Sequence, residues 1–283
     1  MNLKQKIFHL CELYGVRIKK ELGQHFLINP SIYELEIKTA AVNEEDIVLD
    51  IGAGFGFLTE TLANIAKKTY AIEIDPRIIR ALKDRLANLI EKGKLEVVQG
   101  DVLNINFPED VTKIVSNPPY SISSNLIIKT IKELHKRENF KSVVFILQKD
   151  FVERLLSRPC SKNWGRISAT FNYYTNAKYI RTISRKNFYP VPEVDSALIK
   201  YEFKRSKTMI SIEKFETLSK HIFLGTNKTL RKVLKYYLKP LTRNWRKILN
   251  KIAIYVDLNK RIRCVLPKDI EKIIEVLDEK ELL

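Results

Sequence analysis

Five short apolar runs, separated by stretches with helical spacing, constrain the fold of this chain more than any other feature. Strands that alternate with helices predict βαβ units and a doubly wound, mostly parallel sheet. Residues 57–67 and 76–91 have the spacing of the intervening helices. A later run, 197–203, alternates enough to be an edge strand. The five apolar runs are 46–50, 69–74, 95–98, 113–116 and 142–147.

The pattern changes after about Lys204, where no further βαβ unit follows. Four stretches with helical spacing fill the rest of the chain. We therefore expect an α/β domain over residues 1–204 and a small all-helical domain over residues 205–283. The four helical stretches are 212–223, 229–238, 245–254 and 268–282.

Positive charge is concentrated in the second of these domains. The whole chain has a formal net charge of +17, and residues 201–283 hold 20 Lys and Arg against 10 Asp and Glu. Between Lys228 and Lys247 there are eight basic residues and no acidic one. The interleaved rings of Tyr236 and Trp245 favour a nucleic-acid surface, because rings stack on bases while Lys and Arg bind phosphates. A solvated helix face is the alternative. The basic candidates for nucleic-acid contact are Lys228, Arg231, Lys232 and Lys235.

Other features of the sequence argue against several classes of protein. No window approaches the roughly 18 consecutive apolar residues that a membrane span needs. The N-terminus lacks the apolar core of a signal peptide, so we expect a cytoplasmic protein. Cys11, Cys160 and Cys264 are far apart and show neither metal-ligand spacing nor a pairing pattern. We therefore expect no metal site, and cysteines that stay reduced in the cytosol.

A glycine turn follows the first apolar run. Gly52, Gly54 and Gly56 stand at alternate positions, so that the backbone can turn sharply and approach a ligand closely. The spacing G-x-G-x-G differs from the G-x-G-x-x-G of a dinucleotide site. The three glycines are candidate contacts of an adenosine-containing cofactor, and a tight turn without a ligand is the alternative.

Two acidic residues follow the next two strands. Glu73 lies 19 residues after Gly54, where a carboxylate can accept hydrogen bonds from two ribose hydroxyls. Asp101 follows the third strand and can accept a hydrogen bond from an adenine amino group. Ligands of parallel sheets bind beyond the carboxyl ends of the strands, so Gly52, both acids and Asn117 should converge on one crevice. We expect S-adenosylmethionine rather than NAD, because nothing in the chain is arranged for a pyrophosphate.

The tetrapeptide Asn117-Pro118-Pro119-Tyr120 follows the fourth strand and suits an exocyclic amine. The side-chain carbonyl of Asn117 and the backbone carbonyl of Pro118 can accept both N–H groups of the amine, which favours a pyramidal nitrogen with a free lone pair. Tyr120 can stack on the base. The nitrogen then attacks the sulfonium methyl in line, so catalysis consists mostly of positioning and electrostatics. A Pro-Pro turn that begins with Asn is the alternative. The target base has to be single-stranded, looped or flipped out of a duplex.

With these motifs in place, the chain resembles the ribosomal RNA adenine dimethyltransferase family of the KsgA type over nearly its whole length. Residues 23–27, Gly-Gln-His-Phe-Leu, are similar to the family's N-terminal signature, and residues 188–196 are similar to its F-x-P-x-P-x-V-x-S element. Residues 227–231 resemble the K-T-L-R segment that opens a basic helical face. Pro118 stands where the family usually has Leu or Ile.

The resemblance implies a Rossmann-like class I methyltransferase domain and roles for further residues. Gln24, His25 and Leu27 should contact the cofactor. Phe188 should flank the target base opposite Tyr120. Two arginines lie in a stretch similar to a family loop near the target RNA, and these are Arg154 and Arg166.

The implied function is dimethylation of the N6 amines of two adjacent adenines near the 3′ end of small-subunit ribosomal RNA, with S-adenosylmethionine as the methyl donor. The implied partner is a pre-30S or pre-40S particle, and the protein is expected to be monomeric in isolation. One alternative is a large-subunit rRNA adenine N6-methyltransferase of the resistance type. Another is a ribosome-assembly or transcription factor on the same fold, although the intact Asn117 and Glu73 argue against a loss of chemistry.

Overall fold

The computed structural model describes residues 1–18, 23–205, 209–225 and 227–283. These residues form two compact units, one of Met1–Val152 with Asn176–Phe203 and the other of Glu153–Thr175 with Lys204–Leu283. The boundary near Lys204 agrees with the expected division of the chain. The segment Glu153–Thr175, which we expected in the first domain, instead groups with the helical unit.

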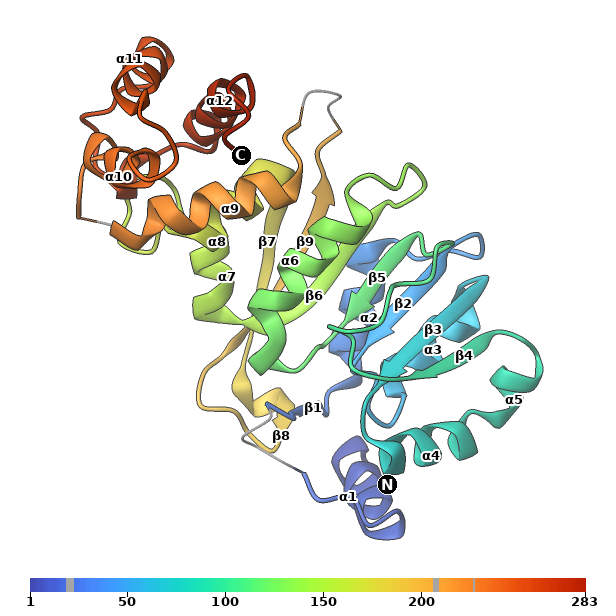
Figure 1. The fold of residues 1–283 in the computed structure, drawn as a ribbon. Helices are drawn as coiled ribbons and strands as arrows, with labels where there is room; N and C mark the ends of the chain where they lie inside the picture. The colour runs from blue at the N-terminus through green and yellow to red at the C-terminus, as the bar shows by residue number, and fades with distance from the viewer. Residues whose placement is uncertain (19–22, 206–208, 226) are drawn as a thin grey trace. The chain divides into compact units, whose positions relative to one another are not determined.

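The first unit is built around a seven-stranded sheet with the strand order β4-β3-β2-β5-β6-β9-β7 (Figure 1). The strands from β4 to β6 run parallel, and β9 pairs antiparallel with β6. The prediction of a doubly wound, mostly parallel sheet is therefore confirmed. The strands are β2 (Ile47–Ile51), β3 (Lys68–Glu73), β4 (Leu95–Gln99), β5 (Lys113–Ser116), β6 (Ser142–Gln148), β7 (Thr175–Ile183) and β9 (Ser196–Phe203).

Two details of the expected sheet were wrong. The run 197–203 does not form an edge strand, because β9 lies between β6 and β7. The sequence did not predict β7, whose residues are mostly exposed and therefore lack the apolar run of a buried strand. The predicted helix over 76–91 is also divided, into α4 (Pro76–Arg85) and α5 (Ala87–Glu91).

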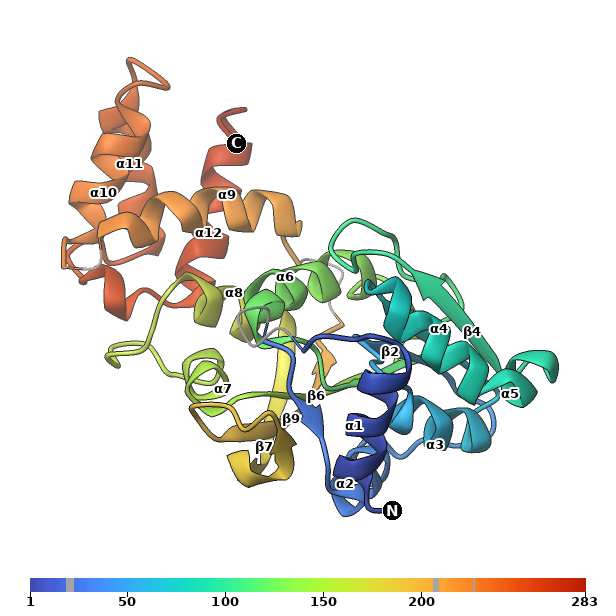
Figure 2. The ribbon, with the colours of Figure 1, turned by 90° about the horizontal axis from the view of Figure 1, so that it is seen from below.

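Helices cover both faces of the sheet. In Figures 1 and 2, α2 (Pro30–Ala40) and α3 (Phe57–Ile65) lie on one face, and α6 (Ser123–Leu134) lies on the other. The side chain of Asn29 caps α2 by accepting a hydrogen bond from the Ser31 amide. The N-terminal helix α1 (Leu3–Leu13) contributes one fully buried side chain, that of Ile7, to a small apolar cluster beside the glycine turn.

The second unit is helical, as the spacing after Lys204 predicts. It contains α8 (Arg166–Tyr174), α9 (Ile212–Ile222), α10 (Leu230–Leu238), α11 (Trp245–Tyr255) and α12 (Pro267–Asp278), while α7 (Lys149–Leu155) spans the boundary between the units. The ring of Tyr173 stacks on Phe215 of α9 with 4.6 Å between the centroids. This contact shows why the segment before residue 176 belongs with the helices that follow residue 204.

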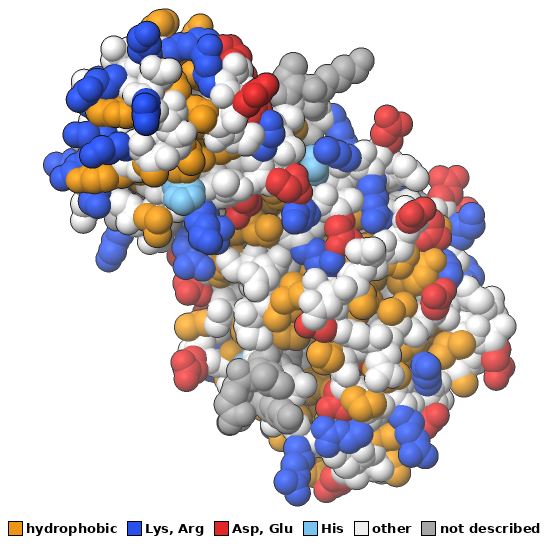
Figure 3. All heavy atoms as spheres, in the orientation of Figure 1, with side chains coloured by type: hydrophobic (Ala, Val, Ile, Leu, Met, Phe, Trp, Pro, Cys, Tyr) orange, Lys and Arg blue, Asp and Glu red, His pale blue; other side chains and the backbone are white. Residues whose placement is uncertain are grey.

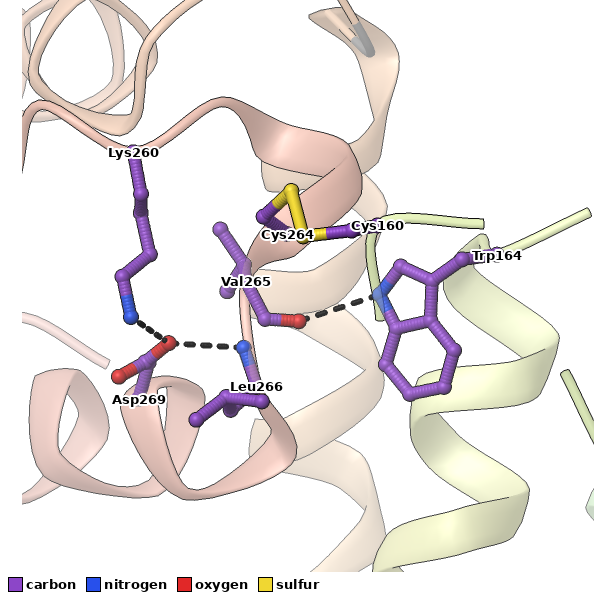
Figure 4. Close-up of a disulfide and its surroundings, with 7 residues drawn as sticks. All are labelled: Cys160, Trp164, Lys260, Cys264, Val265, Leu266 and Asp269. Carbon is purple, nitrogen blue, oxygen red and sulfur yellow. Dashed lines mark hydrogen bonds and ion pairs between the residues drawn. A yellow bond between two sulfur atoms is a disulfide. The ribbon is translucent and has the colours of Figure 1, made fainter. Parts of the chain in front are cut away.

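The expectation of unpaired cysteines was wrong. Cys160 and Cys264 form a disulfide with a Cα–Cα distance of 4.3 Å (Figure 4). The two residues are 104 positions apart in the sequence, so only the folding of the helical unit brings them together. Cys11, the remaining cysteine of the chain, is free in the described structure.

The described residues offer neither a membrane span nor a metal site. Within these ranges, no helix is both long enough and apolar enough to cross a lipid bilayer. The same residues contain no group of three or more His, Cys, Asp or Glu side chains that could hold a metal ion.

Candidate functional site

A cavity of about 250 Å³ lies at the carboxyl ends of the parallel strands in the first unit. Its walls come from the ends of β2, β3, β4 and β5 and from the segment 23–27. Segments far apart in the sequence therefore meet here, as the rule for parallel sheets predicts. The sequence-predicted cofactor residues that line the cavity are Gln24, His25, Leu27, Gly52, Gly54, Glu73, Asp101 and Asn117.

The glycine turn touches the loop that follows β5. Gly52 has a φ of +70°, and a Cβ atom at this position would lie 2.9 Å from Cδ of Pro119. A side chain at Gly54 would lie 3.0 Å from the ring of Phe26. Gly56 does not line the cavity, because it begins α3 and faces Leu82 of α4 instead. Close approach therefore favours glycine at all three positions, facing the cavity at Gly52 and Gly54 and packed helix side chains at Gly56.

The carboxylate of Glu73 is held in place by backbone amides. Its Oε2 atom accepts a hydrogen bond from the Gly54 amide at 3.0 Å, and Oε1 accepts hydrogen bonds from the amides of Ile74 at 2.8 Å and Asp75 at 3.1 Å. Burial raises the pKa of Glu73, which these hydrogen bonds partly offset. The side chain is thus fixed at the end of β3, in the wall of the cavity.

Asp50 is a cavity residue that sequence reasoning missed. It lies at the end of β2 just before the glycine turn, and this position was the signal that could have identified it. Its Oδ2 atom accepts a hydrogen bond from the hydroxyl of Thr59 at 2.7 Å. Burial raises the pKa of Asp50 to about 7, and the nearby charge of Glu73 adds to this effect.

A second buried acid, Glu36, lies close enough to Asp50 for their charges to interact. It lies on the buried side of α2, and burial, followed by the charge of Asp50, raises its pKa well above the ordinary value. Neither of its carboxylate oxygens has a hydrogen-bond partner among the residues that the structure describes. A charge there would be costly, so burial favours the neutral form of Glu36.

Asp101 and Asn117 complete the predicted set at the ends of β4 and β5. The Oδ1 atom of Asp101 accepts a hydrogen bond from the Leu103 amide at 2.9 Å, and Oδ2 accepts one from the side chain of Asn104 at 2.9 Å. Both Asp101 and Asn117 line the cavity. Gly52, Glu73, Asp101 and Asn117 are thus brought together as predicted.

The rest of the Asn-Pro-Pro-Tyr loop lies beside the cavity. Pro118 is buried and does not line it, whereas Pro119 does. Tyr120 begins a short 3-10 helix, Tyr120–Ile122, and lies outside the lining. Burial raises the pKa of the Tyr120 hydroxyl to about 12, so the phenol stays neutral.

The N-terminal signature and the F-x-P-x-P-x-V-x-S element hold this tyrosine in place. The ring of His25 stacks on that of Tyr120, with 5.5 Å between the centroids and an interplanar angle of 28°. The Nδ1 atom of His25 lies 2.7 Å from the carbonyl oxygen of Pro190. The hydroxyl groups of Tyr120 and Ser196 are 2.6 Å apart. Sequence reasoning placed neither Pro190 nor Ser196 in the site, although both belong to the motif that it identified.

The structure places Phe188 in the apolar core. Phe188 belongs to the short strand β8 (Phe188–Tyr189), which pairs with β1 (Phe26–Leu27) so that Phe188 is opposite Leu27. Its side chain is fully buried in an apolar cluster with Ile183 and Leu198. The side chain fills the core in this structure, and its position beside the target base stays a prediction.

The six predicted RNA-binding residues all lie in the helical unit and are exposed. Arg166 forms an ion pair with Glu216 at 2.6 Å. The ammonium group of Lys228 lies 5.9 Å from the ring centre of Tyr236. In Figure 3, Lys and Arg side chains gather over the region of α10 and α11. The six residues are Arg154, Arg166, Lys228, Arg231, Lys232 and Lys235.

Comparison with known proteins gave matches over nearly the whole chain. The family model described as ribosomal RNA adenine dimethylase matches residues 15–277. The chain is 36% identical to the probable ribosomal RNA small subunit methyltransferase A of Thermococcus sibiricus, over 98% of each chain. It is 34% identical to the protein of the same name from Pyrococcus furiosus, over 97% of each chain.

Solved structures agree with these matches. A dimethyladenosine transferase from Plasmodium falciparum has a TM-score of 0.78 and 31% identity, covering 90% of this chain and 98% of the other. The 23S rRNA methyltransferase ErmE has a TM-score of 0.64 and 22% identity, covering 89% of this chain and 99% of the other. The second likeness shows a shared fold.

Proposed function

This chain belongs to the ribosomal RNA adenine dimethylase family, and we propose that it dimethylates the N6 amines of two adjacent adenines near the 3′ end of small-subunit ribosomal RNA. It is an rRNA adenine dimethyltransferase with a class I methyltransferase fold. The proposal that this chain methylates an adenine amine rests on one contact. The glycine turn meets the Asn-Pro-Pro-Tyr loop where Gly52 approaches Pro119. A donor site and an acceptor site therefore adjoin.

The cavity residues fit S-adenosylmethionine as the methyl donor. Gly52 and Gly54 line the cavity without side chains, so the backbone of the turn can approach a ligand closely. The fixed carboxylate of Glu73 can accept hydrogen bonds from ribose hydroxyls, and Asp101 can accept one from the adenine amino group. When bound, the donor supplies an electrophilic methyl group on a positively charged sulfur. The buried carboxyl of Asp50 lies in the wall of the same cavity and favours a cation there.

The acceptor amine would be held by the loop after β5. The side-chain oxygen of Asn117 and the backbone oxygen of Pro118 would accept the two N–H groups of N6. These hydrogen bonds localise the lone pair on the nitrogen, which is otherwise delocalised into the ring. Because Tyr120 is fixed by His25 and Ser196, its ring offers a stationary surface for the base. Catalysis then rests on positioning rather than on a general base.

The exposed cations of the helical unit are the proposed contacts for RNA phosphates. A base inside a duplex cannot reach the cavity, so the target adenines have to be unpaired or flipped out. We propose that the natural partner is a pre-30S or pre-40S particle and that the enzyme acts as a monomer in the cytoplasm. The names of the relatives support a small-subunit substrate.

A direct test is mass spectrometry of ribosomal RNA fragments after incubation with the protein and S-adenosylmethionine. We expect two doubly methylated adenines in one fragment from the 3′ end of small-subunit RNA. Primer extension on both ribosomal RNAs would locate the modified nucleotides. Modification of large-subunit RNA alone would instead favour the resistance-type activity, and no transfer to either RNA would favour an assembly or transcription factor.

A further inference from the structure

Three segments of the helical unit that contain no acidic residue are connected through the Cys160–Cys264 disulfide. We name residues 156–165 the cysteine loop, residues 258–264 the strut, and residues 227–232 the basic segment. The cysteine loop and the strut are joined by the disulfide, and the strut is hydrogen-bonded to the basic segment. The three segments together present the exposed cations Arg158, Lys162, Lys228, Arg231, Lys232 and Arg261.

The strut holds the basic segment through its backbone. The amide of Arg231 donates to the carbonyl of Leu258 at 2.8 Å, and the amide of Leu230 donates to that of Lys260 at 3.0 Å. The amide of Ile262 donates to the carbonyl of Lys228 at 3.0 Å. These backbone hydrogen bonds therefore fix the basic segment relative to the strut.

The cysteine loop is fixed to the strut region by one covalent bond and two hydrogen bonds. The Cys160 amide donates to the carbonyl of Arg263 at 2.7 Å, and the indole N–H of the buried Trp164 donates to the carbonyl of Val265 at 3.1 Å (Figure 4). Cys160 is exposed and has a left-handed φ of +70°, which a residue other than glycine rarely adopts. The backbone at Cys160 is thus held in a conformation that costs free energy.

We propose that this disulfide is a redox-sensitive clamp that sets the spacing of the cations on one phosphate-binding surface for RNA. The identity of the ligand rests on the proposed function, whereas the clamp itself does not. With the disulfide intact, the cations of the cysteine loop and of the basic segment keep a constant separation. Phosphates of a folded RNA are also held at set separations, so a rigid surface binds them with less loss of conformational entropy.

A dithiol reductant can open the clamp by thiol–disulfide exchange. Its thiolate attacks one sulfur and forms a mixed disulfide, and its second thiol then displaces the protein thiol. Two electrons and two protons pass to Cys160 and Cys264, and the reductant becomes a disulfide. The exposed position of Cys160 gives the reductant access. Because Trp164, near the C-terminal end of the cysteine loop, remains buried and hydrogen-bonded, the helical unit stays folded while the part of the loop around Cys160 becomes mobile.

Hydrogen exchange tests the clamp without RNA. A non-reduced digest of the full-length protein should contain the peptide pair joined by Cys160 and Cys264. After treatment with dithiothreitol, we expect amide exchange in the cysteine loop to rise about tenfold or more. Cys160→Ser should show the fast exchange with and without the reductant, whereas Cys11→Ser should behave like the wild type. Free thiols in the untreated protein, or unchanged exchange after reduction, would overturn the clamp.

RNA binding tests the role of the surface. We expect reduction to weaken the binding of a small-subunit rRNA fragment about threefold or more at constant salt, and to have no further effect on Cys160→Ser. If reduction made amide exchange in the cysteine loop faster but left the affinity for RNA unchanged, the disulfide would have no role in RNA binding. If the oxidised protein did not bind RNA at all, the proposed function would fail, and hydrogen exchange would still decide whether the clamp exists.

Discussion

The hydroxyl oxygen of Tyr120 lies 2.6 Å from that of Ser196, although the two residues are 76 positions apart in the chain. This hydrogen bond joins the loop after β5 to the first residue of β9. On the other side, the ring of His25 stacks on Tyr120 and is itself held at Pro190. The aromatic ring beside the proposed acceptor site is therefore fixed by two motifs that the sequence presents as separate.

Removing this hydrogen bond from either side should slow methyl transfer by about tenfold, because the ring loses its fixed position. We expect Ser196→Ala and Tyr120→Phe to lower kcat alike, and the double variant to be no slower than either single one. Donor affinity, measured by calorimetry, should stay unchanged. Full activity of Tyr120→Phe would show that the hydroxyl pair does not matter.

The pKa of Asp50 should link donor binding to pH. Its folded-state pKa of about 7 means that the carboxyl gains its negative charge as the pH rises through neutrality. A cationic donor should therefore bind several-fold more tightly at pH 8 than at pH 6. Calorimetry with S-adenosylhomocysteine, which lacks the positive sulfur, is the matched control and should show a weaker dependence. Asp50→Asn should reduce the difference between the two ligands, and an unchanged difference would contradict this role.

Glu36 should make folding less favourable as the pH rises. Its pKa is raised in the folded state, so the unfolded chain releases the proton first, above an ordinary pKa of about 4.3. The free-energy cost of keeping Glu36 protonated in the folded state then grows with pH until the folded-state pKa is reached. We expect Glu36→Gln to raise the free energy of unfolding relative to wild type, and by more at pH 8 than at pH 5. Urea denaturation at the two pH values measures this.

The matched control for Glu36→Gln is Glu34→Gln, because Glu34 is an exposed acid in the same helix. It should leave the pH dependence of stability almost unchanged. Equal pH dependence in wild type and Glu36→Gln would mean that Glu36 has a partner or an ordinary pKa.

Gly52→Ala should disturb the contact between the two halves of the site. The new Cβ atom would lie 2.9 Å from Pro119, in addition to the strain of a φ of +70°. Gly93→Ala provides the control, because Gly93 has a φ of +69° and no atom of the described residues lies within 4 Å of the added one. We expect Gly93→Ala to cost about 1 kcal/mol of stability, with activity retained. Gly52→Ala should reduce stability by more than this and should also lower donor affinity and the rate of methyl transfer. Equal effects of the two substitutions would refute the steric contact with Pro119.

Substitution of cations on α10 should weaken RNA binding in a salt-dependent way. Lys232→Gln and Lys235→Gln should each reduce the slope of log affinity against log salt by about 1. Lys92→Gln, an exposed cation of the first unit, serves as the control. Asn117→Ala should abolish methyl transfer while RNA binding persists, which separates the site of chemistry from the surface for RNA. A salt slope unaffected by the α10 variants would place the RNA elsewhere.

The sequence by itself determined the parallel strands of the sheet, from β2 to β6, and the convergence of the cofactor residues. Buried parallel strands are short apolar runs, and β5 has the predicted bounds, 113–116. Once the strands are parallel, the residues after their carboxyl ends have to meet, which is why Gly52, Glu73 and Asn117 line one cavity. Local pattern and the geometry of parallel sheets were sufficient for these predictions.

Only the tertiary structure decided which side chains face the cavity and which partners they have. The burial of Phe188, the bond between Tyr120 and Ser196 and the disulfide depend on contacts between residues distant in the chain. Such contacts leave no periodic pattern, because each is set by the path of the backbone through three dimensions. The exposed strand β7 was not predicted for a related reason. It is stabilised by pairing beside β9 and not by burial of its own side chains, so its sequence lacks an apolar run.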